Sequence, residues 1–257
     1  MTFDVAAESY DRFMGRWSAP LAGPFADYAR VAPGQRALDV GCGPGSLTTE
    51  LVARLGADHV AAVDPSEPFV EAARLRHPGV DVRRAAAEGL PHPDAAFDAA
   101  LAQLVVHFMA DPVAGLREMA RVTRAGGIVA ACVWDHGSGR GPLSPFWRAV
   151  RELDPAADDE SELAGARRGH LGELFRAAGL GQVEETELTV ERAFNGFDDW
   201  WEPFTRGVGP AGGYVARLDE DRRARLVDSL RGSLPAGRFA LTAIAWTARG
   251  VRDGHSS

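Results

Sequence analysis

Short segments with the character of buried strands alternate along the chain with stretches in which apolar residues recur every three or four positions. Several of the short segments are too uniformly apolar to have a solvent-facing side, as in a central parallel strand. The stretches between them suit amphipathic helices. Strands are predicted at residues 37–40, 59–64, 80–84, 96–103, 127–134, 182–192 and 239–246. This order predicts an α/β fold built on a seven-stranded, doubly wound, Rossmann-like sheet with helices on both faces.

Apolar spacing and end signals predict the helices. Residues 1–35 precede the first strand and predict two short helices, the second starting at Pro20 and Pro24. Asp111 and Pro112 predict another helix start, because aspartate is a good N-cap and proline suits the first helical position. Further helices are predicted at residues 142–153, 170–178 and 217–231, and around an apolar face made of Phe69, Val70, Ala73 and Leu75.

Residues 37–51 predict a strand, a glycine-rich turn and the first turns of a helix. Gly41, Gly43 and Gly45 carry no Cβ, so the backbone of the turn can take positive φ and come close to a ligand. The free N–H groups at the start of the helix add hydrogen-bond donors. The dinucleotide-binding fingerprint would place its third glycine at Ser46, one position later. Asp39, at the end of the strand, disfavours a pyrophosphate and favours a cation such as an ammonium or a sulfonium.

The composition narrows the function classes. The chain has 257 residues, of which 46% are hydrophobic and 25% charged, as in ordinary globular proteins. All 28 basic residues are arginine, which excludes a Schiff-base lysine for pyridoxal phosphate and a P-loop lysine. The formal net charge of −8 argues against nucleic acid as a partner.

Cysteine usage and the N-terminal sequence predict a cytoplasmic protein. Cys42 and Cys132 have neither disulfide-framework nor zinc-site spacing, and both suit a reducing compartment. No metal site is expected, because histidine and acidic residues do not recur at ligand spacing. The N-terminus has no signal-peptide pattern, and no apolar run is long enough to span a membrane.

Leu-Asp-Val-Gly-Cys-Gly-Pro-Gly, residues 38–45, resembles motif I of the class I S-adenosylmethionine-dependent methyltransferases. The likeness runs from about Tyr10 to about Trp134, and more weakly to the C-terminus, and it is of the ubiquinone/menaquinone-methyltransferase type. It implies S-adenosylmethionine as cofactor, S-adenosylhomocysteine as product, and a last strand that enters the sheet antiparallel. It also implies one methyltransferase domain over residues 1–257, with residues 1–35 as a helical lid over the cofactor.

The resemblance also predicts the residues that hold the cofactor. Arg16 has two open readings, a clamp on the cofactor's α-carboxylate or a solvent-facing arginine on a helix. The family often reads adenine with an aspartate where this chain has Ala86, so the backbone of Ala87 or the side chain of Glu88 must replace it. Asp64 is placed to accept hydrogen bonds from ribose hydroxyls. The predicted cofactor-binding residues are Tyr10, Arg16, Asp39, Gly41, Cys42, Gly43, Gly45, Asp64, Pro65, Ala87, Glu88 and Gln103.

Two histidines are candidate general bases, because histidine titrates near neutral pH. His107 follows the fourth predicted strand, where the resemblance places it at the mouth of the active site, and it is the first candidate. His136 follows the fifth strand, at the edge where open α/β sheets bind their ligands, and it is the second. Either residue can instead be a packing residue of the pocket wall.

The motifs become sparse after residue 137. Residues 195–232 contain an unusual group of aromatic residues and predict an insertion over the active site. Trp200, Trp201, Phe204 and Tyr214 are candidates for an apolar substrate pocket, or alternatively pack an extra helix onto the body.

These patterns predict an enzyme that transfers a methyl group to a small, largely apolar acceptor by in-line displacement. A different class of protein stays open, which binds S-adenosylmethionine without transferring its methyl group. Such a protein would be a binding module, or a catalyst of a cyclisation or rearrangement. A nicotinamide oxidoreductase is disfavoured by the glycine spacing and by Asp39. The acceptor atom and the oligomeric state, monomer or homodimer, are open.

Overall fold

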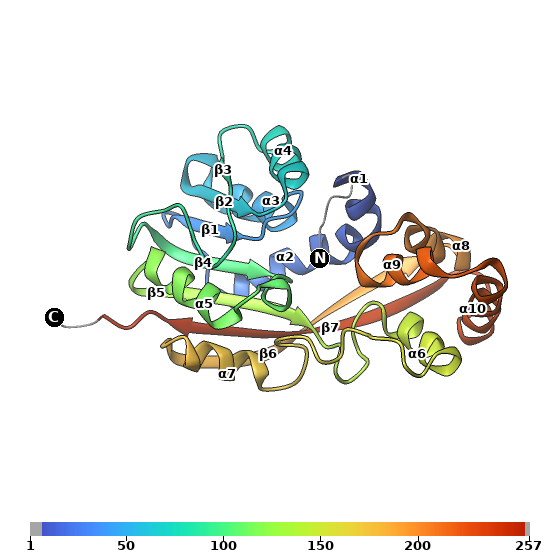
Figure 1. Cartoon of the computed structure of the whole chain (residues 1–257). Coiled ribbons are helices and arrows are strands. Elements are labelled where there is room, and N and C mark those ends of the chain that lie inside the picture. Colours follow the sequence, from blue (N-terminus) through green and yellow to red (C-terminus); the bar gives the residue numbers. More distant parts are fainter. Residues whose placement is uncertain (1–6, 255–257) are drawn as a thin grey trace.

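A seven-stranded sheet runs through the centre of the molecule (Figure 1). The structure, a computed structural model, describes residues 7–254. The strands are β1 (Ala37–Val40), β2 (Val60–Asp64), β3 (Asp81–Arg84), β4 (Phe97–Gln103), β5 (Thr123–Trp134), β6 (Gly181–Phe194) and β7 (Phe239–Val251). Their order in the sheet is β3-β2-β1-β4-β5-β7-β6. From β1 the chain first adds β2 and β3 on one side, and then crosses to add β4 and β5 on the other side. Open α/β sheets bind their ligands at such a switch point, in the crevice at the carboxyl ends of the two central strands.

The predicted strand arrangement is confirmed. β1 to β5 pair in parallel, whereas β7 is antiparallel to both β5 and β6. The last strand therefore inserts between β5 and β6. Parallel strands need both faces covered, and all four residues of β1 and all five of β2 are buried.

Helices cover both faces of the sheet. The helical elements are α1 (Ala7–Tyr10), η1 (Asp11–Gly15), α2 (Arg16–Tyr28), α3 (Ser46–Leu55), η2 (Ala57–His59), α4 (Glu67–Arg76), η3 (Val106–Phe108), α5 (Pro112–Val122), α6 (Ser144–Leu153), α7 (His170–Ala177), α8 (Phe197–Trp201), η4 (Glu202–Arg206), α9 (Gly209–Arg217) and α10 (Glu220–Ser233). Alternate residues of β4 belong to two separate apolar clusters. Ala99 and Leu101 share one cluster with buried residues of α2 and α3, and Ala100 and Ala102 share the other with α5 and α7.

The prediction that a helix starts at Pro20 and Pro24 is wrong. Both prolines lie inside α2, which continues directly from α1 and η1. Trp17, Leu21 and Phe25 recur at i, i+4 and i+8 and are all buried, so the packed face runs past both prolines. Both prolines are on the exposed side, where water can satisfy the carbonyl groups that lose a backbone donor.

Leu75 is also misplaced by the sequence prediction, because 85% of it is exposed. Phe69, Val70 and Ala73 of the same helix are buried as predicted. Leu75 follows Ala73 by two positions, and residues two apart point to different sides of a helix.

The C-terminal half adds a second group of helices at the far end of the long β6 and β7 strands, where α6, α8, α9 and α10 gather (Figure 1). Phe204 is in the middle of this group. Its ring centroid is 4.8 Å from that of Phe146, 4.8 Å from that of Trp200 and 4.9 Å from that of Phe13. These contacts join α6, the 195–232 segment and the N-terminal helices into one apolar cluster.

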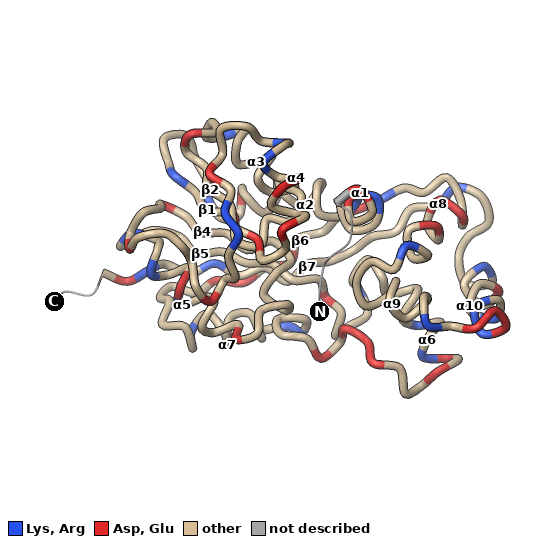
Figure 2. The backbone as a smooth tube through the Cα atoms, turned by 45° about the horizontal axis from the view of Figure 1, so that its top comes forward, with Lys and Arg blue, Asp and Glu red and all other residues tan. Residues whose placement is uncertain are grey.

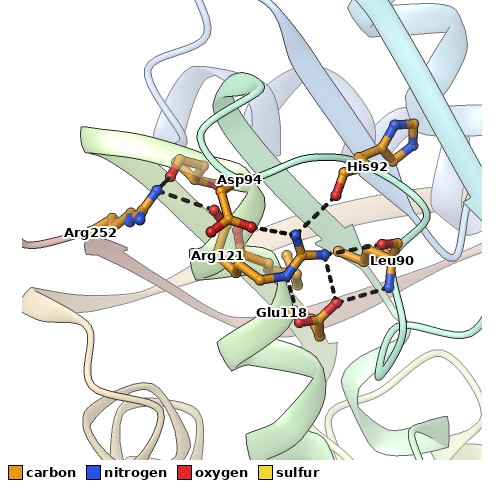
Figure 3. Close-up of polar contacts among 8 residues, drawn as sticks. Leu90, His92, Asp94, Glu118, Arg121 and Arg252 are labelled. Atoms are coloured by element: carbon orange, nitrogen blue, oxygen red, sulfur yellow. Dashed lines mark hydrogen bonds and ion pairs between the residues drawn. The ribbon is translucent and has the colours of Figure 1, made fainter.

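Arg121 of α5 holds the connection between β3 and β4 in place (Figure 3). Its guanidinium donates to Glu118, to Asp94 and to the carbonyl oxygens of Leu90 and His92, at 2.7–3.0 Å. Glu118 also accepts the N–H of Leu90 at 3.0 Å. Charge-assisted hydrogen bonds of this kind fix orientation, so the loop that follows β3 has a defined path.

Figure 2 shows acidic and basic positions interspersed along the described chain, for example on α10. Within residues 7–254, no helix combines the length and the apolar character that crossing a membrane requires.

Candidate functional site

The turn after β1 depends on backbone conformations that favour glycine. Gly41, Gly43 and Gly45 have φ values of +72°, +54° and +101°. A Cβ on Gly41 would lie 2.4 Å from Cγ2 of Val105, which is closer than real contacts allow. The N–H groups of Gly41 and Cys42 both donate to the carbonyl of Val63, at 2.8 and 3.0 Å. The turn is therefore anchored to β2, and its backbone comes unusually close to the residues that follow β4.

Asp64 ends β2 beside this turn. Its Oδ2 accepts the N–H of Gly43 at 2.9 Å, and its Oδ1 accepts the N–H of Ser66 at 2.8 Å. It is 6% exposed, and burial raises the pKa of its carboxyl group. A carboxylate has about four lone-pair sites, so each oxygen can accept a further hydrogen bond, for example from a ribose hydroxyl.

A cavity of about 320 Å³ opens between the turn, the end of β2 and the end of β4. This volume falls within the usual range for small-molecule sites. One wall is polar and backbone-rich, and the other is apolar. The lining residues are Tyr10, Gly41, Gly43, Asp64, Pro65, Ser66, Glu67, Phe69, Arg84, Gln103, Leu104, Val105 and Phe108. Six of these, Tyr10, Gly41, Gly43, Asp64, Pro65 and Gln103, are predicted cofactor-binding residues.

Gln103 connects the end of β4 to α2. Its side-chain Nε2 donates to the carbonyl of Ser18 at 3.0 Å, which fixes the orientation of the amide. Its Oε1 is buried, and within the described chain no donor reaches it. Buried acceptors are nearly always satisfied, so Oε1 is suited to a donor on a bound molecule, such as an ammonium group.

Comparisons with known proteins agree with this geometry. The sequence model of the methyltransferase domain matches residues 38–131. Demethylmenaquinone methyltransferase of Mycobacterium sp. (strain KMS) is 37% identical over 204 residues, which cover 74% of this chain and 83% of that protein. The chain belongs to the class I S-adenosylmethionine-dependent methyltransferases.

A second relative and a solved structure extend the comparison. Malonyl-[acyl-carrier protein] O-methyltransferase of Erwinia billingiae is 36% identical over 128 residues, and this match spans about half (49%) of each chain. Phosphoethanolamine N-methyltransferase 2 of Haemonchus contortus, solved with S-adenosyl-L-methionine, superposes with a TM-score of 0.59 at 17% identity. The superposition covers 96% of this chain and 57% of that one, and it supports the fold.

S-adenosylmethionine is the cofactor of this methyltransferase, and the cavity fits it. The glycine turn leaves room for a close approach, and Asp64 beside it has acceptor sites that suit a ribose. The unpartnered Oε1 of Gln103 suits the ammonium group of the amino-acid part. Within the described residues, no group of three or more His, Cys, Asp and Glu side chains is arranged to hold a metal ion.

Asp39 lies outside the residues that line the cavity. It is 1% exposed, its Oδ2 accepts the hydroxyl of Thr48 at 2.7 Å, and within residues 7–254 its Oδ1 has no hydrogen-bond partner. Burial and the nearby charge of Asp64 raise the pKa of Asp39 to about 7. A direct contact between Asp39 and the cofactor stays a prediction.

We expect Asp39→Asn to stabilise the protein at pH 8. Because the folded-state pKa lies above the unfolded value of about 4, the folded protein binds this proton more tightly than the unfolded chain. The wild-type free energy of unfolding should therefore fall between about pH 4 and pH 7. Asparagine cannot ionise and still accepts the Thr48 hydroxyl, so the gain at pH 8 should be of the order of 2–4 kcal/mol and vanish near pH 4.

Urea unfolding at several pH values measures this effect, with Asp58→Asn, an exposed aspartate before β2, as the control. Parallel stability curves for wild type and Asp39→Asn between pH 4 and pH 8 would contradict it.

Tyr10 and Arg16 occupy different places. Tyr10 lines the cavity, and its ring centroid lies 5.2 Å from that of Phe69. Arg16 lies outside the cavity lining and donates to the carboxylate and the backbone carbonyl of Asp199, at 2.8 and 2.9 Å. In this arrangement the guanidinium links the N-terminal helix to the 195–232 segment.

The two residues predicted to read adenine also lie outside the cavity lining. Ala87 is buried beside α5, where its Cβ lies 3.3 Å from the position that a Cβ on Gly115 would take. Glu88 is partly exposed and accepts the N–H of Asp111 at 3.2 Å, just before α5 begins. Their predicted contacts with adenine stay predictions. Cys42 and Gly45 belong to the turn without lining the cavity.

His107 and His136 lie beside each other at the carboxyl ends of β4 and β5. Their ring centroids are 6.2 Å apart, and that of His107 is 3.9 Å from that of Phe108, which lines the cavity. Both histidines are about nine-tenths buried. Burial and the neighbouring His136 lower the pKa of His107 to about 3.

The four aromatic residues predicted for a substrate pocket lie outside the cavity lining. Trp200 and Phe204 are buried in the C-terminal apolar cluster, and Trp201 stacks on Phe204 with a centroid distance of 5.7 Å. Tyr214 lines a different cavity, between α6 and α10, and its hydroxyl lies 3.3 Å from Asp154. A substrate role for them stays a prediction.

Several lining residues do not appear among the predicted site residues. Apart from Arg84, which ends β3, they fall into two short runs, one after Pro65 and one after Gln103. Leu104 has a φ of +62°, which is rare for a branched side chain and typical of strained functional positions. Adjacency to a predicted contact is the signal that points to both runs. The missed residues are Ser66, Glu67, Phe69, Arg84, Leu104, Val105 and Phe108.

Proposed function

We propose that this methyltransferase transfers a methyl group to a small, largely apolar acceptor by in-line displacement. The observation that carries the proposal is the apolar wall of the cofactor cavity beside His107. Leu104, Val105 and Phe108 make this wall, and the ring centroid of Phe108 lies 3.9 Å from that of His107. A relative with high coverage bears the name of a demethylmenaquinone methyltransferase, which is consistent with an apolar acceptor.

The chain acts mainly by placing the reactants. The cofactor supplies an electrophilic methyl group, and good alignment of the two reacting atoms alone is worth roughly 7–11 kcal/mol. In this proposal Asp64 and Pro65 hold the ribose, and the backbone of Ala87 or the side chain of Glu88 reads the adenine. Tyr10, Gln103 and the glycine turn hold the amino-acid part. Residues 1–35 act as a lid that excludes water, and residues 195–232 act as an insertion over the acceptor; residues 1–6 lie outside the described structure.

His107 is the first candidate base in this proposal and His136 the second. If His107 is the base, His107→Ala should lower kcat for a protonated acceptor by about 100-fold or more while cofactor affinity is kept. Turnover at the wild-type rate, with S-adenosylmethionine still bound, would contradict the assignment. If His107 only forms part of the pocket wall, the substitution should instead change the KM for the acceptor.

Calorimetry with S-adenosylmethionine, followed by a radiolabelled-methyl screen over phenols, quinones, amines and polyketide-like compounds, tests the proposal. Binding of the cofactor together with release of S-adenosylhomocysteine in the presence of an acceptor supports methyl transfer. If the cofactor binds but no S-adenosylhomocysteine is released with any of these acceptors, a catalyst or binding module that does not transfer methyl would be favoured.

A further inference from the structure

Arg76 is the last residue of α4, and its guanidinium joins two segments that lie far apart in the sequence. Its Nη1 donates to the carbonyl of Pro44 in the glycine turn at 2.8 Å, and its Nη2 pairs with Oδ2 of Asp11 at 2.5 Å. Asp11 begins η1, in the N-terminal segment proposed as the lid. One arginine side chain therefore connects the lid to the turn that shapes the cofactor cavity.

The end of α4 also supports the glycine turn at a second point, next to Arg76. Nε2 of His77 lies 3.2 Å from the carbonyl oxygen of Gly45 and 3.2 Å from the hydroxyl oxygen of Thr49. A Cβ on Gly45 would lie 2.7 Å from this nitrogen, so only glycine lets the imidazole come so close to the turn. The turn is thus fixed against α4, and Arg76 extends this support to the lid.

Tyr10, the residue before Asp11, lies close to the same turn on the side of the cavity. Its Cε1 is 4.0 Å from the position that a Cβ on Gly43 would take, which is an ordinary van der Waals distance. Two neighbouring residues of the lid thus lie close to the glycine turn, one by its ring and the other through Arg76. Because Tyr10 and Asp11 are adjacent in the chain, fixing Asp11 also fixes where the Tyr10 ring enters the cavity.

The backbone that follows Tyr10 has a form that suits a functional position. The η1 segment, Asp11–Gly15, is a π-helix, which is rare and occurs mostly as single turns, frequently at functional sites. A Cβ on Gly15 would lie 3.1 Å from Oδ1 of Asp11, so the glycine leaves room for this carboxylate. A second cavity, of about 360 Å³, separates η1 and the start of α2 from α3, and both Asp11 and Arg76 line it. On this side the lid is held by the ion pair at the edge of an open space.

The exposure of the ion pair limits its contribution to the stability of the fold. The side chains of Arg76 and Asp11 are 40% and 30% exposed, and ion pairs of this kind contribute little to the free energy of unfolding. Charge-assisted hydrogen bonds do, however, fix the relative orientation of the groups that they join. The loss of this pair should therefore affect cofactor binding far more than unfolding.

We propose that Arg76 is a positioning residue for S-adenosylmethionine binding, which ties the lid to the glycine turn and so holds Tyr10 in the cavity. This inference rests on the lid role of residues 1–35 in the proposed function, and it adds the contact that keeps the lid closed. Because a closed lid must open before the cofactor leaves, the ion pair acts mainly on the rate of cofactor dissociation.

Calorimetry and surface plasmon resonance with S-adenosylmethionine, without any acceptor, test this role. Arg76→Ala should raise the Kd about tenfold, mostly through a larger dissociation rate constant. Asp11→Ala should raise that rate constant about fivefold or more. The double variant should bind no more weakly than Arg76→Ala, because both changes break the same pair. Arg76→Lys keeps the charge without the planar fork of donors, so its Kd should lie between those of the wild type and Arg76→Ala.

Arg54→Ala is the matched control, because Arg54 likewise contacts a carbonyl oxygen and a carboxylate of another helix. It donates to the carbonyl of Gly23 at 3.1 Å and pairs with Asp27 at 2.7 Å, outside the lining of the cofactor cavity. Cofactor should dissociate from this variant as from the wild type. Equal changes in Arg54→Ala and Arg76→Ala would indicate a general loss of stability and overturn the inference.

A wild-type dissociation rate in Asp11→Ala would also overturn the inference, even if Arg76→Ala binds the cofactor weakly. Arg76 would then act through the glycine turn alone, and the lid would be held by other contacts. Since no acceptor is present in these measurements, that result would leave the proposed methyl transfer standing.

Discussion

Asp64→Ala should weaken S-adenosylmethionine binding by roughly 100-fold or more. A hydrogen bond to a charged group is worth about 1.5–3 kcal/mol, and in the proposed binding mode the two ribose hydroxyl groups donate to this carboxylate. The substitution also removes the acceptor of the Gly43 N–H, so the glycine turn loses one of its anchors. Titration calorimetry measures the affinity, and thermal unfolding of the cofactor-free protein measures the effect on the turn.

Asp58→Ala is the matched control, because Asp58 is exposed and lies just before the opposite end of β2. It should bind S-adenosylmethionine like the wild type. Asp64→Asn keeps one carbonyl oxygen, so its loss of affinity for S-adenosylmethionine should be intermediate. Binding by Asp64→Ala within about threefold of wild type would mean that the ribose is held elsewhere.

The sequence predicts Asp64 beside the turn because both features belong to one local unit. The glycine turn ends β1, the acid ends β2, and the two strands are direct neighbours in a parallel sheet. Once the two strands are recognised, it follows that the turn and the acid lie close together. The same reasoning holds for Gln103, since β4 is the other neighbour of β1.

The same reasoning cannot predict the partner of Arg16. An arginine on a helix can reach many partners, and the partner in the structure, Asp199, lies 183 residues further along the chain. Nothing local to either residue specifies this pair. The aromatic residues of the 195–232 segment pose the same problem, because composition alone does not distinguish a pocket wall from the interior of a packed cluster. Phe204, for example, is closed in by Phe13 and Phe146.

The two histidines differ in a way that sequence position does not reveal. Both follow strands whose carboxyl ends form the same edge of the sheet, and this is the signal that selects them. The charge around each ring depends on which carboxylates already pair with arginine, as Asp135 does with Arg140. That pairing is a property of the packed loops, and no local sequence pattern specifies it.

Gly41→Ala should lower the free energy of unfolding by about 2–4 kcal/mol and severely reduce S-adenosylmethionine binding. An L side chain at a φ of +72° costs about 1–2 kcal/mol, and overpacking typically costs about 1–3 kcal/mol more. The new Cβ would lie 2.4 Å from Cγ2 of Val105 and 2.6 Å from its Cγ1. Val105 also lines the cofactor cavity, so a displacement that relieves the clash changes the shape of the site.

Two further variants separate the cost of the backbone conformation from the cost of the contact with Val105. Gly34→Ala has a similar φ of +87° with open space around the new Cβ, so it should lose only the conformational part, about 1–2 kcal/mol. Adding Val105→Ala to Gly41→Ala should recover part of the loss in stability, because it removes both contacting methyl groups. Urea unfolding and calorimetry on the wild type, these three variants and Val105→Ala alone measure stability, binding and the coupling between the two positions. Equal losses in Gly34→Ala and Gly41→Ala, with no coupling to Val105, would show that the contact between the turn and Val105 does not shape the site.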